Sequence, residues 1–195
     1  AITINKLELL MEDETLSQAQ LQQLSEAKAS LTRMATLNKS LLTLARIENR
    51  QYEEVSPICF ASLLGTLIEE YQDLIAFKEI TLSITEKSPF SVQMNKDLAV
   101  ILLSNLLRNA IKYTYPKGKI LIKIDKHVFS IANEGKPTPL DADKIFKRFH
   151  KGEQDSTSTG LGLAIVKSIV DLYQHIRLQY VYKEEKHTFL IFNYQ

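Results

Sequence analysis

The chain has 195 residues, of which 45% are hydrophobic and 24% are charged, a balance that is ordinary for a soluble globular protein of one or two domains. Its 24 basic and 23 acidic residues leave a formal net charge of +1, which removes the electrostatic case for a nucleic-acid binder. The single cysteine, Cys59, excludes an intrachain disulfide framework and favours a reducing compartment.

The opening stretch, residues 2 to 11, has the periodicity of an amphipathic helix, because its apolar side chains from Ile4 to Met11 recur every three or four positions. Ala1 opens the sequence inside this pattern, so we expect a cut within a longer helix. No signal-peptide pattern is present, and the longest apolar run, residues 98 to 107, has about half the length of a membrane span. We therefore expect a fragment that does not itself cross a membrane.

A second and longer helix is predicted from about residue 17 to residue 49, after the polar group at residues 12 to 15. Two helices joined by a short polar turn form an antiparallel hairpin. The apolar stripe of the longer helix must be covered, either by a second hairpin in a dimeric four-helix bundle or by the C-terminal domain of the same chain, and we expect the dimer. The stripe consists of Leu21, Leu24, Leu31, Met34, Leu41, Leu42, Ala45 and Ile47.

The helical periodicity fails around residues 49 to 57, where Pro57 marks the join to a second domain. We place the hairpin domain at residues 1–52 and the second domain at residues 53–195. The apolar patterns of the second domain predict a mixed α+β sandwich with helices on one face of a sheet. Its predicted helices span residues 60–77, 95–113 and 160–173, and its predicted strands span residues 80–85, 90–94, 119–125, 127–133, 176–182 and 188–194.

Two of the six glycines, Gly160 and Gly162, stand at the entrance of an apolar helix. Because glycine inside a helix costs about 1 kcal/mol relative to alanine, the pair suggests that something approaches the backbone closely there. A phosphate at the helix N-terminus is one explanation. An ordinary loop-to-helix junction is the other.

Asn105 and Asn109 lie four residues apart and therefore project from one face of their helix, with Lys112 and Tyr113 one turn further on. Asparagine is a poor residue for a helix interior, so two on one face require an explanation. Their amide oxygens could coordinate a hard cation such as Mg²⁺ beside nucleotide phosphates. Alternatively, they belong to a polar face in solvent.

Four stretches together carry a resemblance: "NLLRNAIKYT", "IANEGKPTP", "IFKRFHKG" and "TGLGLAIVKSIV" resemble, in this order, the N, G1, F and G2 boxes of the sensor histidine kinases of two-component systems. The hairpin resembles the dimerisation and phosphotransfer domain of the same family, here truncated. The resemblance implies that residues 53–195 form a catalytic ATP-binding domain of the histidine kinase, gyrase and Hsp90 type. It also implies a homodimer that binds Mg²⁺ and ATP.

In this family the terminal phosphate of ATP passes to a histidine on the first hairpin helix, and from there to an aspartate of a response regulator. The four histidines of this chain, His127, His150, His175 and His187, all lie in the second domain. We therefore expect that this fragment does not phosphorylate itself. The resemblance further implies a parent protein that is a bacterial inner-membrane sensor, with this chain as a cytoplasmic part.

Within the N box, the resemblance implies that Asn109 ligates Mg²⁺ and that Asn105 supports it at the phosphates. Lys112 would face the phosphates, and Tyr113 would lie beside the nucleotide. The resemblance thus implies catalytic roles for Asn105, Asn109 and Lys112, a metal-binding role for Asn109 and a nucleotide-binding role for Tyr113.

Within the G2 box, the resemblance implies that Gly160 and Gly162 let the triphosphate reach the N-terminal amides of the following helix. Thr159, Leu161 and Leu163 would complete this phosphate-binding segment.

A lid over the nucleotide is implied for residues 134 to 159. Phe146 and Phe149 of the F box would anchor it, or would form a simple apolar hinge. Lys151 falls where the family often places a basic residue near the terminal phosphate, although a solvated lysine is an equal alternative in a loop.

The G1 box departs from the family pattern at Asn133, which replaces an aspartate that accepts a hydrogen bond from the adenine amino group. An asparagine oxygen can accept the same bond without charge assistance, while its NH₂ group needs a partner of its own. Gly135 matches the first glycine of the box, and Pro137 replaces the second, which stiffens the loop.

Two other functional classes remain open. ATPases of the gyrase and Hsp90 type place a glutamate four residues before the magnesium-binding asparagine, whereas this chain has Asn105, whose amide cannot act as a general base. This difference favours a kinase. The other possibility is a degenerate docking module for a response regulator, which only Asn133 and Pro137 support.

Overall fold

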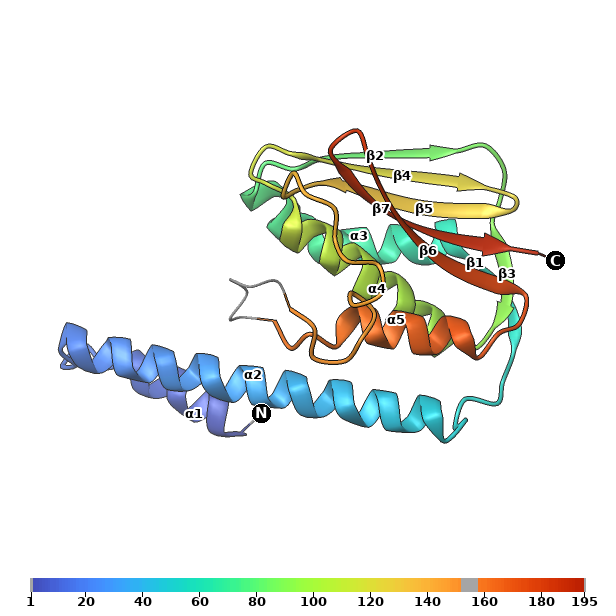
Figure 1. The fold of residues 1–195 in the computed structure, drawn as a ribbon. Coiled ribbons are helices and arrows are strands. Elements are labelled where there is room, and N and C mark those ends of the chain that lie inside the picture. Colours follow the sequence, from blue (N-terminus) through green and yellow to red (C-terminus); the bar gives the residue numbers. More distant parts are fainter. Residues whose placement is uncertain (1, 152–157, 195) are drawn as a thin grey trace.

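The computed structural model describes residues 2–151 and 158–194. Its helices are α1 (Ile2–Met11), α2 (Gln18–Glu48), α3 (Phe60–Phe77), α4 (Lys96–Tyr113) and α5 (Gly162–Asp171). Its strands are β1 (Ser56–Cys59), β2 (Thr81–Glu86), β3 (Ser91–Met94), β4 (Lys119–Asp125), β5 (Val128–Glu134), β6 (Ile176–Lys183) and β7 (Lys186–Asn193). Figure 1 shows the sheet at the top, α3 to α5 beneath it, and the hairpin of α1 and α2 at the bottom. The predicted α+β architecture is confirmed.

The hairpin follows the predicted bounds almost to the residue, because its turn carries strong local signals. Ser17 and Gln20 form a capping box at the start of α2: the Ser17 hydroxyl accepts from the Gln20 N–H at 3.3 Å, and Gln20 Oε1 accepts from the Ser17 N–H at 2.9 Å. Asn49 caps the other end of the helix.

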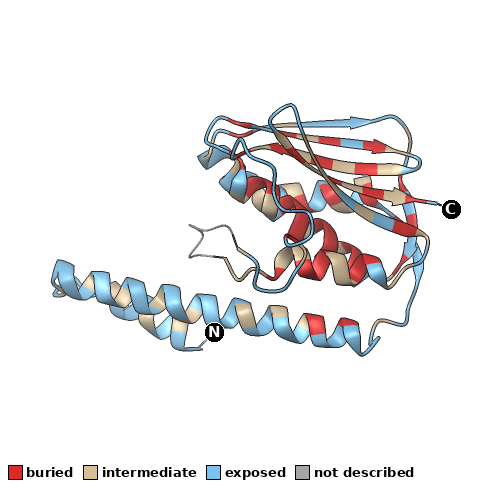
Figure 2. Cartoon of the chain, in the orientation of Figure 1, coloured by how far each residue is buried: buried red, intermediate tan, exposed pale blue. Residues whose placement is uncertain are grey.

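The apolar stripe of α2 is covered unevenly. Leu44 and Ile47, in its last turns, are each 1% exposed and join the core of the second domain, where α2 packs against α5. Met34, Leu41 and Leu42 remain exposed in the chain described here. Figure 2 shows the same contrast, with buried residues only near the C-terminal end of α2. Cover by the chain's own second domain, the alternative to the expected dimer, therefore holds for that end of the stripe.

The second domain is built on a five-stranded sheet with the order β2-β4-β5-β7-β6, in which only β2 and β4 are parallel. A separate two-stranded sheet pairs β1 with β3. The sequence patterns did not predict β1, because Pro57 lies within it and a proline normally argues against a strand. Here β1 pairs with β3 along one of its edges, and such an edge strand tolerates a proline because not every N–H has to join a ladder.

The core lies between the sheet and α3 to α5. Alternate residues of β4, β5 and β7 face the helices, and Phe60, Phe90 and Phe129 form an aromatic cluster with ring centroids 4.9 to 6.3 Å apart. The same alternation places two polar residues at one end of these inward rows. Asn133 on β5 and His187 on β7 are both buried and are paired in register.

None of the helices in the described ranges is both long and apolar enough to cross a lipid bilayer.

Candidate functional site

A cavity of about 1070 Å³ opens between α2, α4, the segment that leads into α5 and the helix-facing side of the sheet. It brings together most of the residues predicted for the site. Those that line it are Asn105, Asn109, Lys112, Tyr113, Asn133, Lys151, Thr159, Gly160, Gly162 and Leu163. The other predicted site residues, Gly135, Phe146, Phe149 and Leu161, are not part of the lining.

The part of the cavity next to the sheet, here called its inner end, has apolar walls with several polar groups among them. Leu140, Ile145 and Phe189 provide its hydrophobic lining, and Asn133, which is 2% exposed, contributes the amide. Hydrophobic walls with a few hydrogen-bonding groups suit a planar aromatic ring with polar edges.

His187 holds the loop that follows β5. Its Nε2 lies 2.8 Å from the Lys136 carbonyl oxygen, which can only accept, so Nε2 donates there. In the neutral ring Nδ1 then accepts from the Tyr180 hydroxyl at 2.8 Å, and the oxygen of that hydroxyl accepts from the Leu140 N–H at 3.0 Å. Burial raises the pKa of Tyr180, which keeps its hydroxyl proton available for this bond.

The sequence analysis did not single out His187 or Tyr180. A signal was present, because "KHTFLIF" alternates and places His187 on the same inward row as Phe189 and Ile191. A polar residue on the buried row of a strand is unusual enough to mark a site.

The outer end of the cavity is cationic. Arg108, Lys112 and Lys151 line it together with Asn109. The Lys112 ammonium lies 5.4 Å from the centroid of the Tyr113 ring, a cation–π distance. Arg108 was missed by the sequence analysis, although it stands between the two asparagines of the N box.

Asn105 is engaged within the protein. Its Nδ2 donates to the Ile101 carbonyl oxygen at 2.7 Å, and its Oδ1 accepts from Arg108 at 2.9 Å. A Cβ on Gly162 would lie 3.1 Å from the same Oδ1, so a glycine lets α5 approach α4 closely here. Asn105 thus holds Arg108 and contacts the start of α5.

The start of α5 offers backbone N–H groups. Its N-cap residue, Leu161, makes no side-chain capping bond, and the first bond of the helix runs from the Ile165 N–H to the Leu161 carbonyl. Amides of an uncapped first turn, together with the helix dipole, favour an anion. The helix begins at Gly162 rather than at the predicted residue 160.

Gly160 meets a requirement of the protein's own backbone. Its φ is +69°, and a Cβ there would lie 2.7 Å from the Phe149 carbonyl carbon and 2.8 Å from the His150 carbonyl oxygen. The close approach predicted from the glycine pair is therefore real, but in this structure the approaching group at Gly160 is the F-box segment. Gly135 is a similar case, since a Cβ there would lie 2.9 Å from the Tyr113 carbonyl oxygen.

The two phenylalanines of the F box differ. Phe146 packs edge-on against Phe189, with ring centroids 6.4 Å apart, and so anchors the segment to the cavity wall. Phe149 is 57% exposed and has a φ of +62°, so of the two rings only Phe146 packs against the core among the described residues. Part of the predicted lid, residues 152–157, lies outside the described residues.

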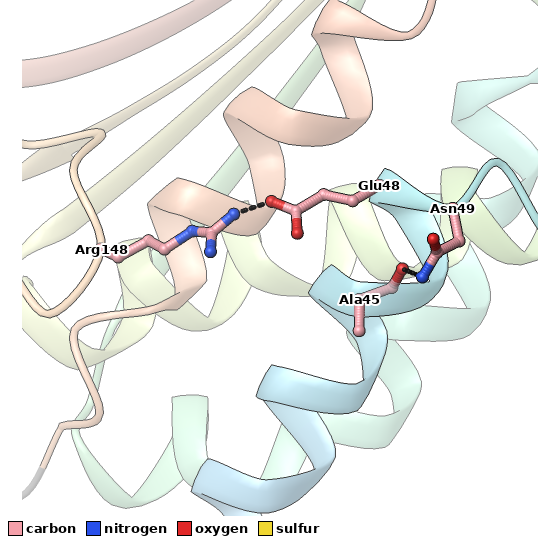
Figure 3. Close-up of polar contacts among 4 residues, drawn as sticks. All are labelled: Ala45, Glu48, Asn49 and Arg148. Atoms are coloured by element: carbon pink, nitrogen blue, oxygen red, sulfur yellow. Dashed lines mark hydrogen bonds and ion pairs between the residues drawn. The ribbon is translucent and has the colours of Figure 1, made fainter.

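The F box is also tied to the hairpin. Arg148 donates to the carboxylate of Glu48, in the last turn of α2, as Figure 3 shows. In the same view the Asn49 amide donates to the Ala45 carbonyl oxygen at 2.9 Å and closes the end of the helix. The ion pair links two segments one hundred residues apart in the sequence.

Lys78, at the C-terminal end of α3, caps the end of α4. Its ammonium donates to the carbonyl oxygens of Ile111 and Lys112 at 2.8 Å and of Thr114 at 3.1 Å. Burial, together with the positive charge of Lys112, lowers the pKa of Lys78. These bonds fix the turn of α4 that carries Lys112 and Tyr113.

The hairpin contributes one wall of the cavity. This contribution was not predicted from the sequence. The lining includes side chains from one face of α2: Ser25, Lys28, Ala29, Thr32, Arg33 and Thr36. This wall forms because α2 packs along α5. An amphipathic periodicity shows which face of a helix is apolar, but it does not show which element packs against that helix.

The side chains that line the cavity limit the kind of metal ion that could bind there. Among residues 2–151 and 158–194, no three histidine, cysteine or acidic side chains come together as a metal site. Asn109 lines the cationic end of the cavity with an amide, a type of oxygen ligand that Mg²⁺ accepts. Such a site fits Mg²⁺ that arrives with phosphate oxygens, and it does not fit a metal held by protein ligands alone.

Sequence comparison identifies a curated relative that is similar over most of this chain. The heme sensor protein HssS of Staphylococcus aureus (strain Newman) is 31% identical over 178 residues, which cover 89% of this chain and 38% of HssS. This chain therefore spans well under half the length of that relative.

Solved structures establish the fold. Full-length ShkA in complex with AMPPNP superposes with a TM-score of 0.72 at 23% identity, covering 95% of this chain and 41% of ShkA. Histidine kinase ThkA in complex with the response regulator protein TrrA gives a TM-score of 0.69 at 20% identity, covering 99% of this chain and 57% of that one. Residues 94–194, more than half of the chain, match the family described as histidine kinase-, DNA gyrase B- and HSP90-like ATPases. The chain belongs to this family, and its resemblance to the sensor histidine kinases is confirmed.

Proposed function

We propose that this chain binds ATP with Mg²⁺ in the cavity and serves as the nucleotide-binding part of a sensor histidine kinase. The observation that carries the proposal is the make-up of one cavity: an inner end with apolar walls and a buried amide continues into cationic side chains beside an uncapped helix N-terminus. A nucleoside triphosphate has the same polarity, with a planar base at one end and several negative charges at the other.

The residues then take distinct roles. Asn133 receives the adenine edge between Leu140, Ile145 and Phe189. Lys112, with Tyr113 beside it, faces the phosphates.

At the phosphate end, the amides from Gly160 to Leu163 receive the triphosphate, with Thr159 next to them. Lys151 and Arg108 add positive charge there. Phe146 holds the lid segment that carries Lys151.

A bound Mg²⁺ would supply positive charge at the phosphates, and Asn109 is the side chain that we propose would hold it. Asn105 supports the site indirectly, because its amide holds Arg108 and contacts Gly162. Since an amide cannot activate water, the site lacks the general base of a hydrolase at this position, and bound ATP is kept for transfer to a side chain. Phosphoryl transfer then depends on positioning and on the cations.

The partners follow from the same proposal. Residues 1–52 form part of a dimerisation and phosphotransfer domain, and residues 53–195 form the catalytic domain. The exposed Met34, Leu41 and Leu42 of α2 support pairing with a second hairpin. The phosphoacceptor is a histidine of the dimerisation helix, and an aspartate of a response regulator receives the phosphate next. The whole protein is proposed to be a membrane sensor, with this chain on its cytoplasmic side.

Calorimetric titration with a non-hydrolysable ATP analogue, with and without Mg²⁺, tests the nucleotide site. We expect binding that depends on Mg²⁺ and that weakens at least about tenfold in Asn109→Ala. The matched control is Asn38→Ala, an exposed asparagine of α2 outside the cavity lining, which should bind like the unaltered chain. Equal affinity in Asn109→Ala would reject its metal role, and no binding at all would reject the proposed function.

A further inference from the structure

Asn133 has hydrogen-bonding capacity that the described residues leave unused. It is 2% exposed and lines the inner end of the cavity. The one hydrogen bond that its side chain makes to residues 2–151 or 158–194 runs from Nδ2 to the Glu134 carbonyl oxygen, at 3.5 Å. That distance is the outer limit for such a bond, so neither end of the amide is held firmly.

The neighbouring polar groups cannot take over its role. Both ring nitrogens of His187 are already bonded, to Tyr180 and to Lys136. The Thr114 hydroxyl donates to the Ala110 carbonyl oxygen at 2.6 Å. Since Leu140, Ile145 and Phe189 are apolar, Asn133 is the buried side chain that we assign to the polar edge of a bound base.

An amide reads such an edge differently from a carboxylate. A carboxylate only accepts, so it pairs with the 6-amino group of adenine and repels a 6-oxo group. An asparagine side chain accepts through its oxygen and donates through its nitrogen, and a rotation of 180° exchanges the two. Among the described residues, this rotation costs Asn133 the long bond to Glu134, and its oxygen then lies near the Glu134 carbonyl oxygen at a similar distance.

We infer that the inner end of the cavity accepts 6-oxopurine nucleotides as well as 6-aminopurine nucleotides, with Asn133 turned to suit each base. This inference rests on the proposed nucleotide function of the cavity. Hypoxanthine, the base of ITP, is the sharpest probe, since it has the 6-oxo group without the additional 2-amino group of guanine. Its ring nitrogen next to the 6-position carries a proton that adenine lacks, and a water molecule in a cavity of about 1070 Å³ can accept from it.

The test compares non-hydrolysable analogues of ATP and ITP by calorimetry on the intact chain with Mg²⁺. We expect the two dissociation constants to lie within about tenfold of each other, because the same side chain makes one hydrogen bond to either base. In Asn133→Asp the ITP analogue should bind at least about a hundredfold more weakly than the ATP analogue, because a fixed acceptor faces its 6-oxo group.

The outcomes separate the inference from the function beneath it. If neither analogue binds the unaltered chain, the proposed function fails. If the ATP analogue binds and the ITP analogue is over a hundredfold weaker, the function stands and the inference is overturned. Equal discrimination in the unaltered chain and in Asn133→Asp would also overturn it, because another group would then read the base.

Two controls guard against an unfolded variant. Asn38→Asp adds the same charge on an exposed face of α2 and should leave both affinities unchanged. Asn133→Ala removes donor and acceptor together, so we expect both analogues to weaken by a similar factor. Thermal unfolding of each variant establishes that the domain is folded before affinities are compared.

Discussion

The two sides of the cavity are held in place by very different means. The side formed by the second domain is fixed by close backbone approaches at Gly160 and Gly135 and by the triple cap from Lys78. The side formed by α2 presents mostly exposed side chains. Among the described residues, its contacts with the second domain lie toward its C-terminal end, where Leu44 and Ile47 are buried and Glu48 pairs with Arg148. The side of the cavity formed by the second domain is therefore rigidly positioned, whereas few described contacts fix the position of the side formed by α2.

Gly160→Ala should have the largest effect on stability, because it adds a methyl group where the backbone at Gly160 contacts the backbone of Phe149 and His150. A Cβ at φ +69°, within 3 Å of the Phe149 and His150 backbone, should cost about 3 kcal/mol of unfolding free energy. Chemical denaturation measures it. The matched control is Gly65→Ala in α3, where a Cβ meets nothing within 4 Å, so stability should rise by about 0.5 kcal/mol.

Lys78→Met should come next, at a loss of about 2 kcal/mol, because three carbonyl oxygens at the end of α4 lose a charged donor. The same denaturation measurement applies. Lys117→Met, at a side chain that is mostly exposed and paired loosely with Glu79 at 3.7 Å, is the control and should change little. Equal losses in the two variants would mean that the cap does not hold the site.

Tyr180→Phe should cost about 1 kcal/mol, because the Leu140 N–H loses its acceptor and His187 loses a donor. The substitution should also change how the unfolding free energy depends on pH in the alkaline range. Since the pKa of Tyr180 is raised on folding, its contribution is complete below the pKa of the unfolded chain and is lost as the pH rises through the folded pKa. We expect a shallower alkaline decline in Tyr180→Phe than in the control Tyr194→Phe, whose ring is exposed.

Glu48→Gln should have the smallest effect, at most about 0.5 kcal/mol, because the partly exposed pair with Arg148 is screened by solvent. Added salt should reduce even this difference. Glu53→Gln, in the exposed join between the domains, serves as the control. A loss in Glu48→Gln greater than in Lys78→Met would reverse the comparison between the two sides.

Local signals explain how much of the fold could be predicted. The helix bounds were accurate where a cap marks them, as at Ser17 and Asn95, and the strands were accurate where apolar residues alternate. The short strand around Pro57 was missed, because its pairing depends on β3, thirty or so residues further along the chain.

The site divides in the same way. Asn109, Lys112 and the glycines carry a motif that can be recognised in the sequence, whereas His187, Tyr180 and Lys78 act through partners that only folding brings near. The α2 wall belongs to the second group. Gly160 shows a further limit, because the sequence indicated a close approach but could not indicate which group approaches.

The burial of Leu44 and Ile47 has a consequence for cooperativity. Because these side chains belong to the core of the second domain, the last turns of α2 should unfold with the sheet, while the turns before residue 36 can fray on their own. The amides of α2 should therefore be increasingly protected from hydrogen exchange toward the C-terminal end of the helix. A displacement of the first turns of α2 would therefore deform that part of the helix first, and it would reach the second domain through turns whose side chains belong to that domain's core.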